Sequence, residues 1–152
     1  MTHKTVAKNR KARFDYHILE TFEAGLVLTG TEIKSVREGS LNLKDGYAKI
    51  QDGELWLFNV HISPYEKGSY YNHDPVRPRK MLMNRYEIRR LTSKIQEKGL
   101  TLVPLSVYIK NGKYAKVDLA LAQGKTHRDK RQTVAKRDAH REMARAVRRD
   151  DR

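Results

Sequence analysis

The sequence of 152 residues contains no cysteine, which excludes a disulfide framework and any zinc site built on thiolates. It also has no apolar run of about 18 residues, the length that a helix needs to span a membrane. The N-terminus is basic but lacks the apolar core of a secretory signal peptide. The lack of cysteine fits a cytoplasmic protein, because disulfides are rare in a reducing compartment, and the lack of a long apolar run predicts that no segment spans a membrane.

Motifs that carry catalytic or metal chemistry are missing as well. No two histidines have metal-ligand spacing with a carboxylate partner, so we predict no metal site; they are His3, His17, His61, His73, His127 and His140. Gly25 to Gly30 has the glycine spacing of a phosphate loop, but Thr31-Glu32 follows where Lys-Ser/Thr is needed. No serine or threonine lies in a nucleophile-elbow motif. We therefore predict no catalytic residue, no cofactor and no enzymatic activity.

Positive charge is concentrated at the two ends of the chain. The net charge is +14; residues 1–13 carry five Lys and Arg and no acid, and residues 123–152 carry 11 against five Asp and Glu. The ends together hold +11, which leaves +3 for residues 14–122. We therefore predict three segments: a basic N-terminal arm over residues 1–13, a folded domain over 14–122 and a basic C-terminal tail over 123–152.

The composition of the two ends indicates what they bind. Such segments cannot bury enough apolar surface to fold alone, so we expect them to become ordered on contact with a polyanionic partner. A pI near 10.1 with clustered Lys and Arg points first to nucleic acid. An anionic membrane surface is the second candidate, but the tail has few large apolar residues that could enter lipid.

Two hairpins are predicted in the domain. Asn111-Gly112 accepts positive φ at both central positions of a type I′ turn. It separates two runs in which apolar residues alternate, first Val103, Leu105, Val107 and Ile109 and then Ala115, Val117, Leu119 and Leu121. Pro104 lacks a backbone donor, so we expect this strand to start there or to lie at a sheet edge. The second hairpin has Asp52-Gly53 at its tip.

One further strand and two helices complete the expected domain. The strand spans Tyr16 to Leu28, with Gly25 as a bend or bulge. One helix begins at Asn84, with Glu87 in the reciprocal capping position, and ends at Gly99. A shorter helix runs from about Thr31 to Val36. These elements predict a mainly β protein, a small closed antiparallel OB-type barrel with two short helices, because closure removes exposed strand edges.

The segment from Pro64 to Arg79 is predicted to be a loop rich in aromatic residues. It holds Tyr65, Tyr70, Tyr71 and His73, with Arg77, Arg79 and Lys80 close behind. Flat rings beside guanidinium groups can stack on nucleotide bases. The alternative is that the tyrosines pack on the wall of the barrel, and the sequence leaves both open.

Several strings of residues, in their order and spacing, resemble one family, the SsrA-binding proteins or SmpB family. They are Asn9-Arg10-Lys11-Ala12-Arg13, Phe22-Glu23-Ala24-Gly25-Leu26, Gly30-Thr31-Glu32-Ile33-Lys34-Ser35 followed by Arg37, Arg79-Lys80-Met81-Leu82-Met83-Asn84, and Asp129-Lys130-Arg131 after Gly124-Lys125. The resemblance covers about residues 5–145. It implies an OB-type barrel that binds the tRNA-like domain of transfer-messenger RNA (tmRNA, also SsrA RNA) and is not an enzyme.

The resemblance also implies a cellular role and a set of RNA contacts. The family delivers tmRNA to stalled ribosomes for trans-translation, and we expect a monomer when it is bound to RNA. The residues that match family positions or lie beside them, and that we expect to bind tmRNA, are Arg10, Lys11, Arg13, Glu23, Lys34, Arg37, Arg79, Lys80, Leu82 and Asn84. Two of these positions have structural alternatives: Asn84 as a helix cap and Leu82 as a core residue.

The tail has its own implied partner, the small-subunit decoding centre and the empty mRNA channel of the ribosome. The matching tail residues are Lys125, His127, Arg128, Asp129, Lys130 and Arg131. Thr126 stands where the family motif has a second Lys, and either Arg128 or His127 takes the stacking position. Residues 130–149 contain no Gly or Pro, so helix propensity is high. Their sparse apolar residues predict a tail that is disordered or helical only on a partner.

Three other functions stay open on the residues alone. A structural ribosomal protein would share basic ends on a small barrel, and a generic RNA-binding OB module would share the domain. A small RNA-processing enzyme is the third. One fold can serve many functions, so composition and residue patterns alone predict only a basic RNA-binding barrel with a basic tail.

Overall fold

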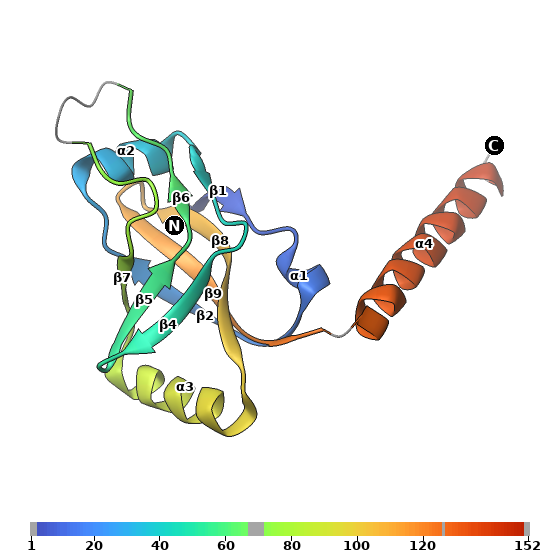
Figure 1. The fold of residues 1–152 in the computed structure, drawn as a ribbon. Coiled ribbons are helices and arrows are strands. Elements are labelled where there is room, and N and C mark those ends of the chain that lie inside the picture. The colour runs from blue at the N-terminus through green and yellow to red at the C-terminus, as the bar shows by residue number, and fades with distance from the viewer. Residues whose placement is uncertain (1–2, 67–71, 126, 151–152) are drawn as a thin grey trace.

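The strands of the computed structural model form one large antiparallel sheet, so the protein is mainly β (Figure 1). The structure describes residues 3–66, 72–125 and 127–150. In chain order the elements are β1 (His3–Lys8), α1 (Ala12–Asp15), β2 (Tyr16–Leu26), α2 (Gly30–Arg37), β3 (Leu41–Asn42), β4 (Tyr47–Gln51), β5 (Glu54–Phe58), β6 (His61–Ile62), β7 (Arg79–Leu82), α3 (Arg85–Lys98), β8 (Thr101–Lys110), β9 (Tyr114–Gly124) and α4 (His127–Asp150).

Strand pairing in the large sheet links elements that lie far apart in the sequence. The order is β1-β8-β4-β5-β7-β2-β9, and β9 pairs in addition with β8. The pairings therefore run from β8 through β4, β5, β7, β2 and β9 back to β8, with β1 added on the outside of β8. The short strands β3 and β6 form a separate pair.

Both predicted hairpins are confirmed. Asn111 and Gly112 have φ values of 55° and 68°, and the Lys113 N–H donates to the Lys110 carbonyl at 3.2 Å, as a type I′ turn requires. Asp52 and Gly53 have φ values of 52° and 76° between β4 and β5. In both turns the sequence supplies residues that tolerate the left-handed region.

Two details of the strands differ from the prediction. Pro104 lies inside β8, which pairs on both sides with other strands, rather than at a strand start or a sheet edge. The register shifts between Pro104 and Ser106, and such a bulge accommodates a residue without a backbone donor. In β2 the irregularity falls between Ile18 and Glu20, whereas Gly25 is paired regularly on both sides.

The basic N-terminal segment is part of the sheet. His3–Lys8 pairs with β8, and the Asn9 N–H donates to the Leu105 carbonyl at 2.7 Å. The Asn9 side-chain amide donates to the Pro104 carbonyl at 3.0 Å, and Ala12 is buried. The expectation that this end becomes ordered only on a partner is therefore wrong for these residues, because the free edge of β8 supplies their backbone partners.

The core lies between the strands, and α3 covers one end of it. It is built from inward residues of the alternating strands: Ala48, Leu55, Leu57, Met81, Leu102, Val107, Leu119 and Leu121, together with Ile88 and Leu91 of α3. Trp56 and Phe58 are half-buried on the other face of β5, so this strand is covered on both sides.

The two predicted helices are present, but the reciprocal capping box lies at α2 and not at α3. In α3 the Asn84 side chain accepts a hydrogen bond from the Tyr86 N–H at 2.9 Å, and Glu87 pairs with Arg90 instead of closing a reciprocal cap. The reciprocal capping box belongs to α2, between Thr29 and Glu32. Helix α3 ends at Gly99, as predicted.

Two further helices contact each other: α1, which was not predicted, and α4, which covers the tail that the sequence predicts to be disordered or helical only on a partner. The Lys130 ammonium of α4 lies 3.3 Å from the Asp15 carboxylate of α1 and 5.7 Å from the centre of the Phe14 ring. Arg137 lies over the same ring at 5.4 Å. From this contact α4 extends away from the sheet (Figure 1). None of the described helices combines the length and the apolar character needed to cross a membrane.

Gly99 provides a test of the α3 boundary. Its φ of 60° lies in the left-handed region, so we expect Gly99→Ala to lower the free energy of unfolding by about 1 kcal/mol. Gly30→Ala is the matched control: the added methyl meets no atom within 4 Å and the backbone there is helical, so stability should stay equal or rise slightly. Urea denaturation measures the free energy of unfolding of both variants. An equal effect of the two substitutions would contradict the role of Gly99 as the left-handed residue that ends α3.

Candidate nucleic-acid interface

Glu23 lies on the outer face of the sheet, held by side chains from β8. Strand alternation directs Ala24 into the core and Glu23 outward. The Tyr108 hydroxyl donates to one carboxylate oxygen of Glu23, and the Lys110 ammonium lies 3.5 Å from the other. Asp118 of β9 is paired in register beside Glu23. The carboxylate is therefore exposed but oriented by two neighbours.

These contacts control which groups are charged. The hydrogen bond from Tyr108 lowers the pKa of Glu23, against a smaller opposing effect of burial, and Lys110 and Lys116 lower it further. Burial raises the pKa of Tyr108, and its bond to Glu23 raises it further. Burial also raises the pKa of Asp118, opposed by Arg13. At neutral pH Glu23 is thus an ionised hydrogen-bond acceptor.

Leu82 and Gly25 are register partners, which brings the end of β7 next to Glu23. Leu82 is 57% exposed, so it is not a core residue. A Cβ at Gly25 would lie 3.3 Å from the Leu82 Cβ, which means that both positions face the same side of the sheet as Glu23. The structure thus brings together Glu23 and Leu82, two predicted RNA-binding residues that are 59 positions apart in the sequence.

Asn84 follows Leu82 at the start of α3. Its side-chain oxygen caps the helix, so the structural alternative for this residue is confirmed. The side chain is exposed, and its NH₂ group makes no hydrogen bond to the part of the chain that the structure describes. The cap and a contact to a ligand are therefore compatible.

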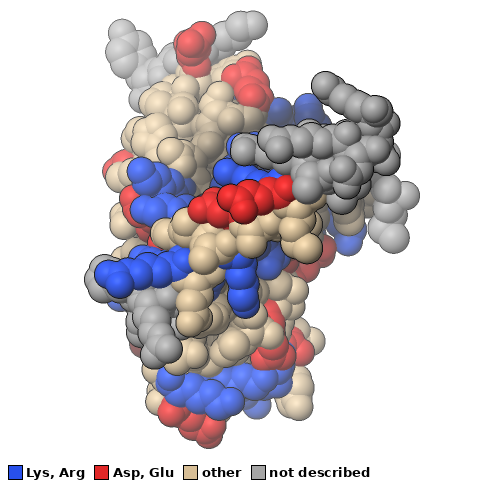
Figure 2. Space-filling view, turned by 90° about the vertical axis from the view of Figure 1, so that its right-hand side faces the viewer, with Lys and Arg blue, Asp and Glu red and all other residues tan. Residues whose placement is uncertain are grey.

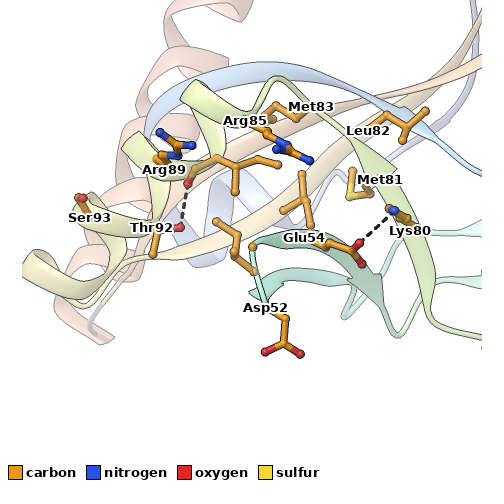
Figure 3. Close-up of a pocket in the computed structure, with 14 residues that line it drawn as sticks. Asp52, Glu54, Lys80, Met81, Leu82, Met83, Arg85, Arg89, Thr92 and Ser93 are labelled. Atoms are coloured by element: carbon orange, nitrogen blue, oxygen red, sulfur yellow. Dashed lines mark hydrogen bonds and ion pairs between the residues drawn. The ribbon is translucent and has the colours of Figure 1, made fainter.

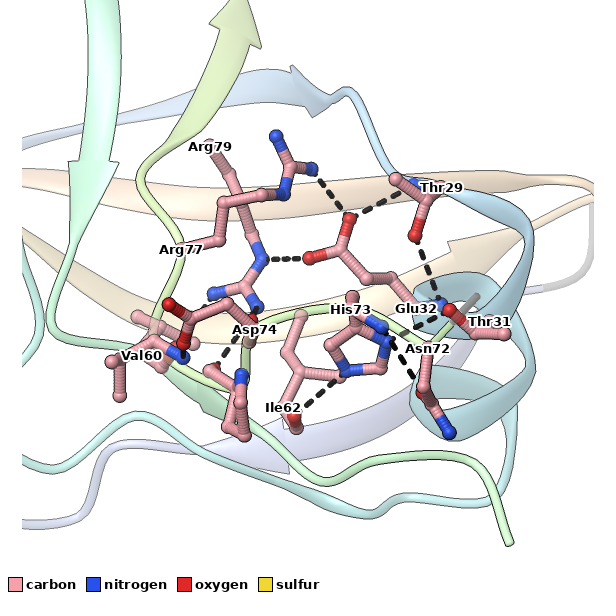
Figure 4. Close-up of polar contacts among 12 residues, drawn as sticks. Thr29, Thr31, Glu32, Val60, Ile62, Asn72, His73, Asp74, Arg77 and Arg79 are labelled. Carbon is pink, nitrogen blue, oxygen red and sulfur yellow. Dashed lines mark hydrogen bonds and ion pairs between the residues drawn. The ribbon is translucent and has the colours of Figure 1, made fainter. Parts of the chain in front are cut away.

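Glu32 is fully buried and joins three segments of the chain (Figure 4). One carboxylate oxygen accepts from Arg77 at 2.5 Å and from the Thr29 N–H at 2.9 Å; the other accepts from Arg79 Nε at 2.5 Å. Burial on its own raises the pKa of Glu32, but the hydrogen bonds of Arg77, Thr29 and Arg79 outweigh it and hold the pKa at about 2.

Arg79 does not belong to the surface that could contact RNA. It is 1% exposed, and its guanidinium also donates to the Val60 carbonyl at 2.7 Å and to the Pro75 carbonyl at 3.1 Å. Arg79 provides the hydrogen bond to one of the two buried oxygens of Glu32, and losing this buried pair would cost several kcal/mol, so the guanidinium stays inside the fold. The expected RNA contact at Arg79 is therefore wrong, and its family string reflects an internal ion pair.

The loop from Pro64 to Arg79 also contacts α2 near Glu32, through His73 and Tyr65. His73 contacts the Thr31 hydroxyl through Nδ1 and the Ile62 carbonyl through Nε2, both at 2.9 Å (Figure 4). The Tyr65 ring lies 5.4 Å from the Lys34 ammonium. His73 therefore packs on the domain, whereas the alternative for the tyrosines stays a prediction. Tyr70 and Tyr71 lie outside the described residues.

The other predicted cations are exposed or half-buried, and they are distributed over several elements. Arg37 of α2 donates to the Gly112 carbonyl at 2.8 Å, and Lys80 of β7 lies 3.2 Å from the Glu54 carboxylate. Arg10, Lys11 and Arg13 lie at or beside α1, with Lys11 4.0 Å from Asp15. Figure 2 shows Lys and Arg in separate groups, with acidic side chains between them, on the side that carries α1 and α4.

The predicted tail residues begin next to α1. The Lys125 ammonium donates to the Arg13 carbonyl at 3.0 Å, and the Lys125 N–H donates to the Asp15 carbonyl at 2.9 Å. Lys130 pairs with Asp15, and Arg131 is exposed. The side chains of His127, Arg128 and Asp129 lie outside the described ones, so which of them stacks stays a prediction. The tail starts from a defined place on the domain.

A groove of about 880 Å³ separates α3 from the tip of the β4–β5 hairpin (Figure 3). Arg85 and Arg89 line it one helical turn apart, with Lys80 and Leu82 on the β7 side. Neither arginine forms an ion pair or hydrogen bond with the described residues. Sequence analysis missed both; their spacing of four residues on a predicted helix is the signal that could have found them.

Comparison with known proteins identifies the family. The model of the family described as SmpB protein matches residues 6–149. The chain belongs to the SmpB family. The SsrA-binding protein of Desulforudis audaxviator is 63% identical over 145 residues, which are 95% of this chain and 94% of that protein. The SsrA-binding protein of Carboxydothermus hydrogenoformans is 60% identical over 145 residues, 95% of this chain and 97% of that one.

A solved structure also resembles this SmpB-family chain. It is called "tmRNA-SmpB: a journey to the center of the bacterial ribosome". The TM-score is 0.67 and the sequence identity 52%, and the match covers 84% of this chain and 93% of that one. The resemblance that the sequence strings indicated is confirmed.

The buried Glu32 provides a stability test. Because its folded pKa lies below the ordinary value of 4.5, its contribution is complete above pH 4.5 and is lost as the pH falls towards about 2. We expect Glu32→Gln to cost about 3–5 kcal/mol of unfolding free energy at pH 7 and to flatten this acid loss. Glu54→Gln, at the exposed pair with Lys80, should cost under about 1 kcal/mol. Urea denaturation between pH 2 and 7 measures both costs, and similar values for the two variants would contradict the stabilising role of the buried Glu32.

The Tyr108 hydroxyl provides a test of Glu23. Tyr108→Phe removes the hydrogen bond that most lowers the pKa of Glu23, so this pKa should rise towards the ordinary value. NMR titration of the Glu23 carboxyl carbon measures it. Tyr114→Phe is the control, because the Tyr114 hydroxyl has no hydrogen bond to any described residue. An unchanged Glu23 pKa in Tyr108→Phe would show that the hydroxyl does not hold the carboxylate.

Proposed function

We propose that this chain binds the tRNA-like domain of tmRNA and delivers it to stalled ribosomes for trans-translation, or ribosome rescue. The observation that carries the proposal is the match to the SmpB family over residues 6–149. Relatives at 60–63% identity are named SsrA-binding proteins, and the structural neighbour is called tmRNA-SmpB at the centre of the bacterial ribosome. This role is one of binding, performed in the cytoplasm by a monomer on its RNA, and needs no catalysis by the protein.

We further propose that the sheet is a closed OB-type barrel. The circuit of pairings from β8 through β4, β5, β7, β2 and β9 back to β8 supports this reading. Its weakest links are β4–β8, with one residue pair, and β2–β7, with two. A closed sheet presents a rigid outer face, which recognition of folded RNA by shape requires.

Affinity and selectivity have different sources on this surface. Lys and Arg side chains that bind phosphates release counterions, so binding should weaken steeply with salt. Glu23 cannot bind a phosphate, since both are anions. An ionised carboxylate accepts hydrogen bonds, and its partners on RNA are base N–H groups and ribose 2′-hydroxyls. We propose that Glu23 supplies selectivity, while Arg10, Lys11, Arg13, Lys34, Arg37 and Lys80 supply affinity and Leu82 and Asn84 position the RNA.

For the tail we propose a separate role, in the decoding centre and the empty mRNA channel. Helix α4 spans 24 residues, or about 36 Å, with mostly exposed side chains where they are described. A basic helix of this length fits a channel lined by RNA and competes with mRNA for the same space. Its first turn is held at Phe14 and Asp15, so the domain sets the point from which the tail enters.

Removal of the tail separates the two activities. A chain that ends after Lys125 retains the whole of β9, so it should bind tmRNA within about threefold of the full protein, since the proposed contacts lie on the domain. It should lose tagging of nascent peptides on ribosomes stalled without a stop codon. Electrophoretic mobility shift with tmRNA and with tRNA, and a translation assay, measure the two. Failure of the full protein to prefer tmRNA over tRNA would overturn the proposed function.

A further inference from the structure

Two large apolar side chains that face solvent line the same hollow. Tyr114 is 58% exposed and Leu82 is 57% exposed. Both line a depression of about 250 Å³, together with Gly25, Lys113 and Lys116. Exposed apolar side chains are common singly, but two such groups around one hollow indicate a binding surface.

The strand register builds this hollow. Gly25 of β2 is paired with Leu82 of β7 on one side and with Lys116 of β9 on the other. A Cβ at Gly25 would lie 3.3 Å from the Leu82 Cβ and 3.7 Å from the Lys116 ammonium. Because glycine has no side chain, the surface at Gly25 is recessed between these two side chains. Tyr114 precedes Lys116 by two residues and therefore faces the same side of the sheet.

The side chains at the rim are available to a ligand. Within residues 3–66, 72–125 and 127–150, the side chains of Tyr114 and Lys113 have no hydrogen bond, ion pair or ring contact. Lys116 lies near enough to Glu23 to lower its pKa. The hollow thus offers a flat ring, an aliphatic side chain and two cations.

This combination matches one chemical class. A nucleobase has two flat apolar faces and is joined to an anionic phosphate, so it can stack on a tyrosine while lysines bind the phosphates beside it. An apolar peptide would use the ring and the leucine but would gain nothing from the two lysines. Continuity with Glu23, two residues from Gly25, favours RNA further, because the carboxylate accepts from base N–H groups.

We propose that the hollow binds one unstacked base of the RNA between Tyr114 and Leu82, with Lys113 and Lys116 on the flanking phosphates. The inference rests on the proposed function, since it describes how the same surface binds tmRNA. It adds Tyr114 as a residue for RNA recognition and stacking as the mode. The base therefore belongs to a loop or another unpaired segment, because paired bases are stacked within the helix.

Substitutions at Tyr114 provide the test, with in vitro transcribed tmRNA as the probe. We expect Tyr114→Ala to weaken binding about 5- to 150-fold, the range for loss of one aromatic–base stack. Tyr114→Phe keeps the ring and should bind within about twofold, whereas Tyr114→Leu keeps apolar volume without a flat ring and should resemble Tyr114→Ala. Tyr86→Ala is the matched control, since Tyr86 is 71% exposed on α3 and does not line the hollow.

The salt dependence separates stacking from charge. Tyr114→Ala should lower affinity equally at all salt concentrations, whereas Lys116→Ala should reduce the slope of log K against log salt by about 0.7–0.9, one phosphate contact. Thermal unfolding checks that each variant is folded. Tyr114→Ala binding as tightly as the unchanged protein, or Tyr114→Leu as tightly as Tyr114→Phe, would overturn the inference and leave the proposed function intact. Failure of the unchanged protein to bind tmRNA would instead overturn the proposed function.

Discussion

The buried carboxylate of Glu32 is the interaction on which the arrangement of the surface depends. It caps α2 through Thr29 and pairs with Arg77 and Arg79, so it holds the helix, the long loop and the start of β7 together. Leu82 ends β7 three residues after Arg79. A shift of β7 would move Leu82 away from Gly25 and the outer face around Glu23. Loss of the buried Glu32–Arg79 pair would therefore displace Leu82 on the outer face of the sheet.

The basic residues fall into two groups, those that form ion pairs within the protein and those that do not. Arg77, Arg79, Arg90 and Lys94 are bound to Glu32 or Glu20 inside the fold or at its surface. A cation that is already paired with a carboxylate contributes less to counterion release, so the net charge of the chain overstates the charge available to RNA. The cations without a protein partner matter more for binding, and among the described residues these include Lys113 on the β8–β9 turn and Arg85 and Arg89 on α3.

The family match and the geometry account for different parts of the function. Membership of the SmpB family relates the chain to proteins named for binding SsrA RNA, over nearly its whole length. The geometry indicates how a small sheet presents an ionised acceptor, a leucine and a tyrosine on one face. The tail is attached at Phe14 and Asp15, next to Arg13 of α1 and close in sequence to Arg10 and Lys11. The face around Glu23 and the tail are therefore separate segments of one short chain.

The sequence by itself determined the features that depend on neighbours along the chain. Asn111-Gly112 and Asp52-Gly53 form turns, Gly99 ends α3, and strand alternation separates core from surface, because these follow from local backbone preferences. Only the tertiary structure decided that Arg79 is buried, that Pro104 lies at a bulge, and that Leu82 pairs with Gly25 and lines the same hollow as Tyr114. These depend on which distant strands pair and in which register, and period-two alternation is identical for every such pairing.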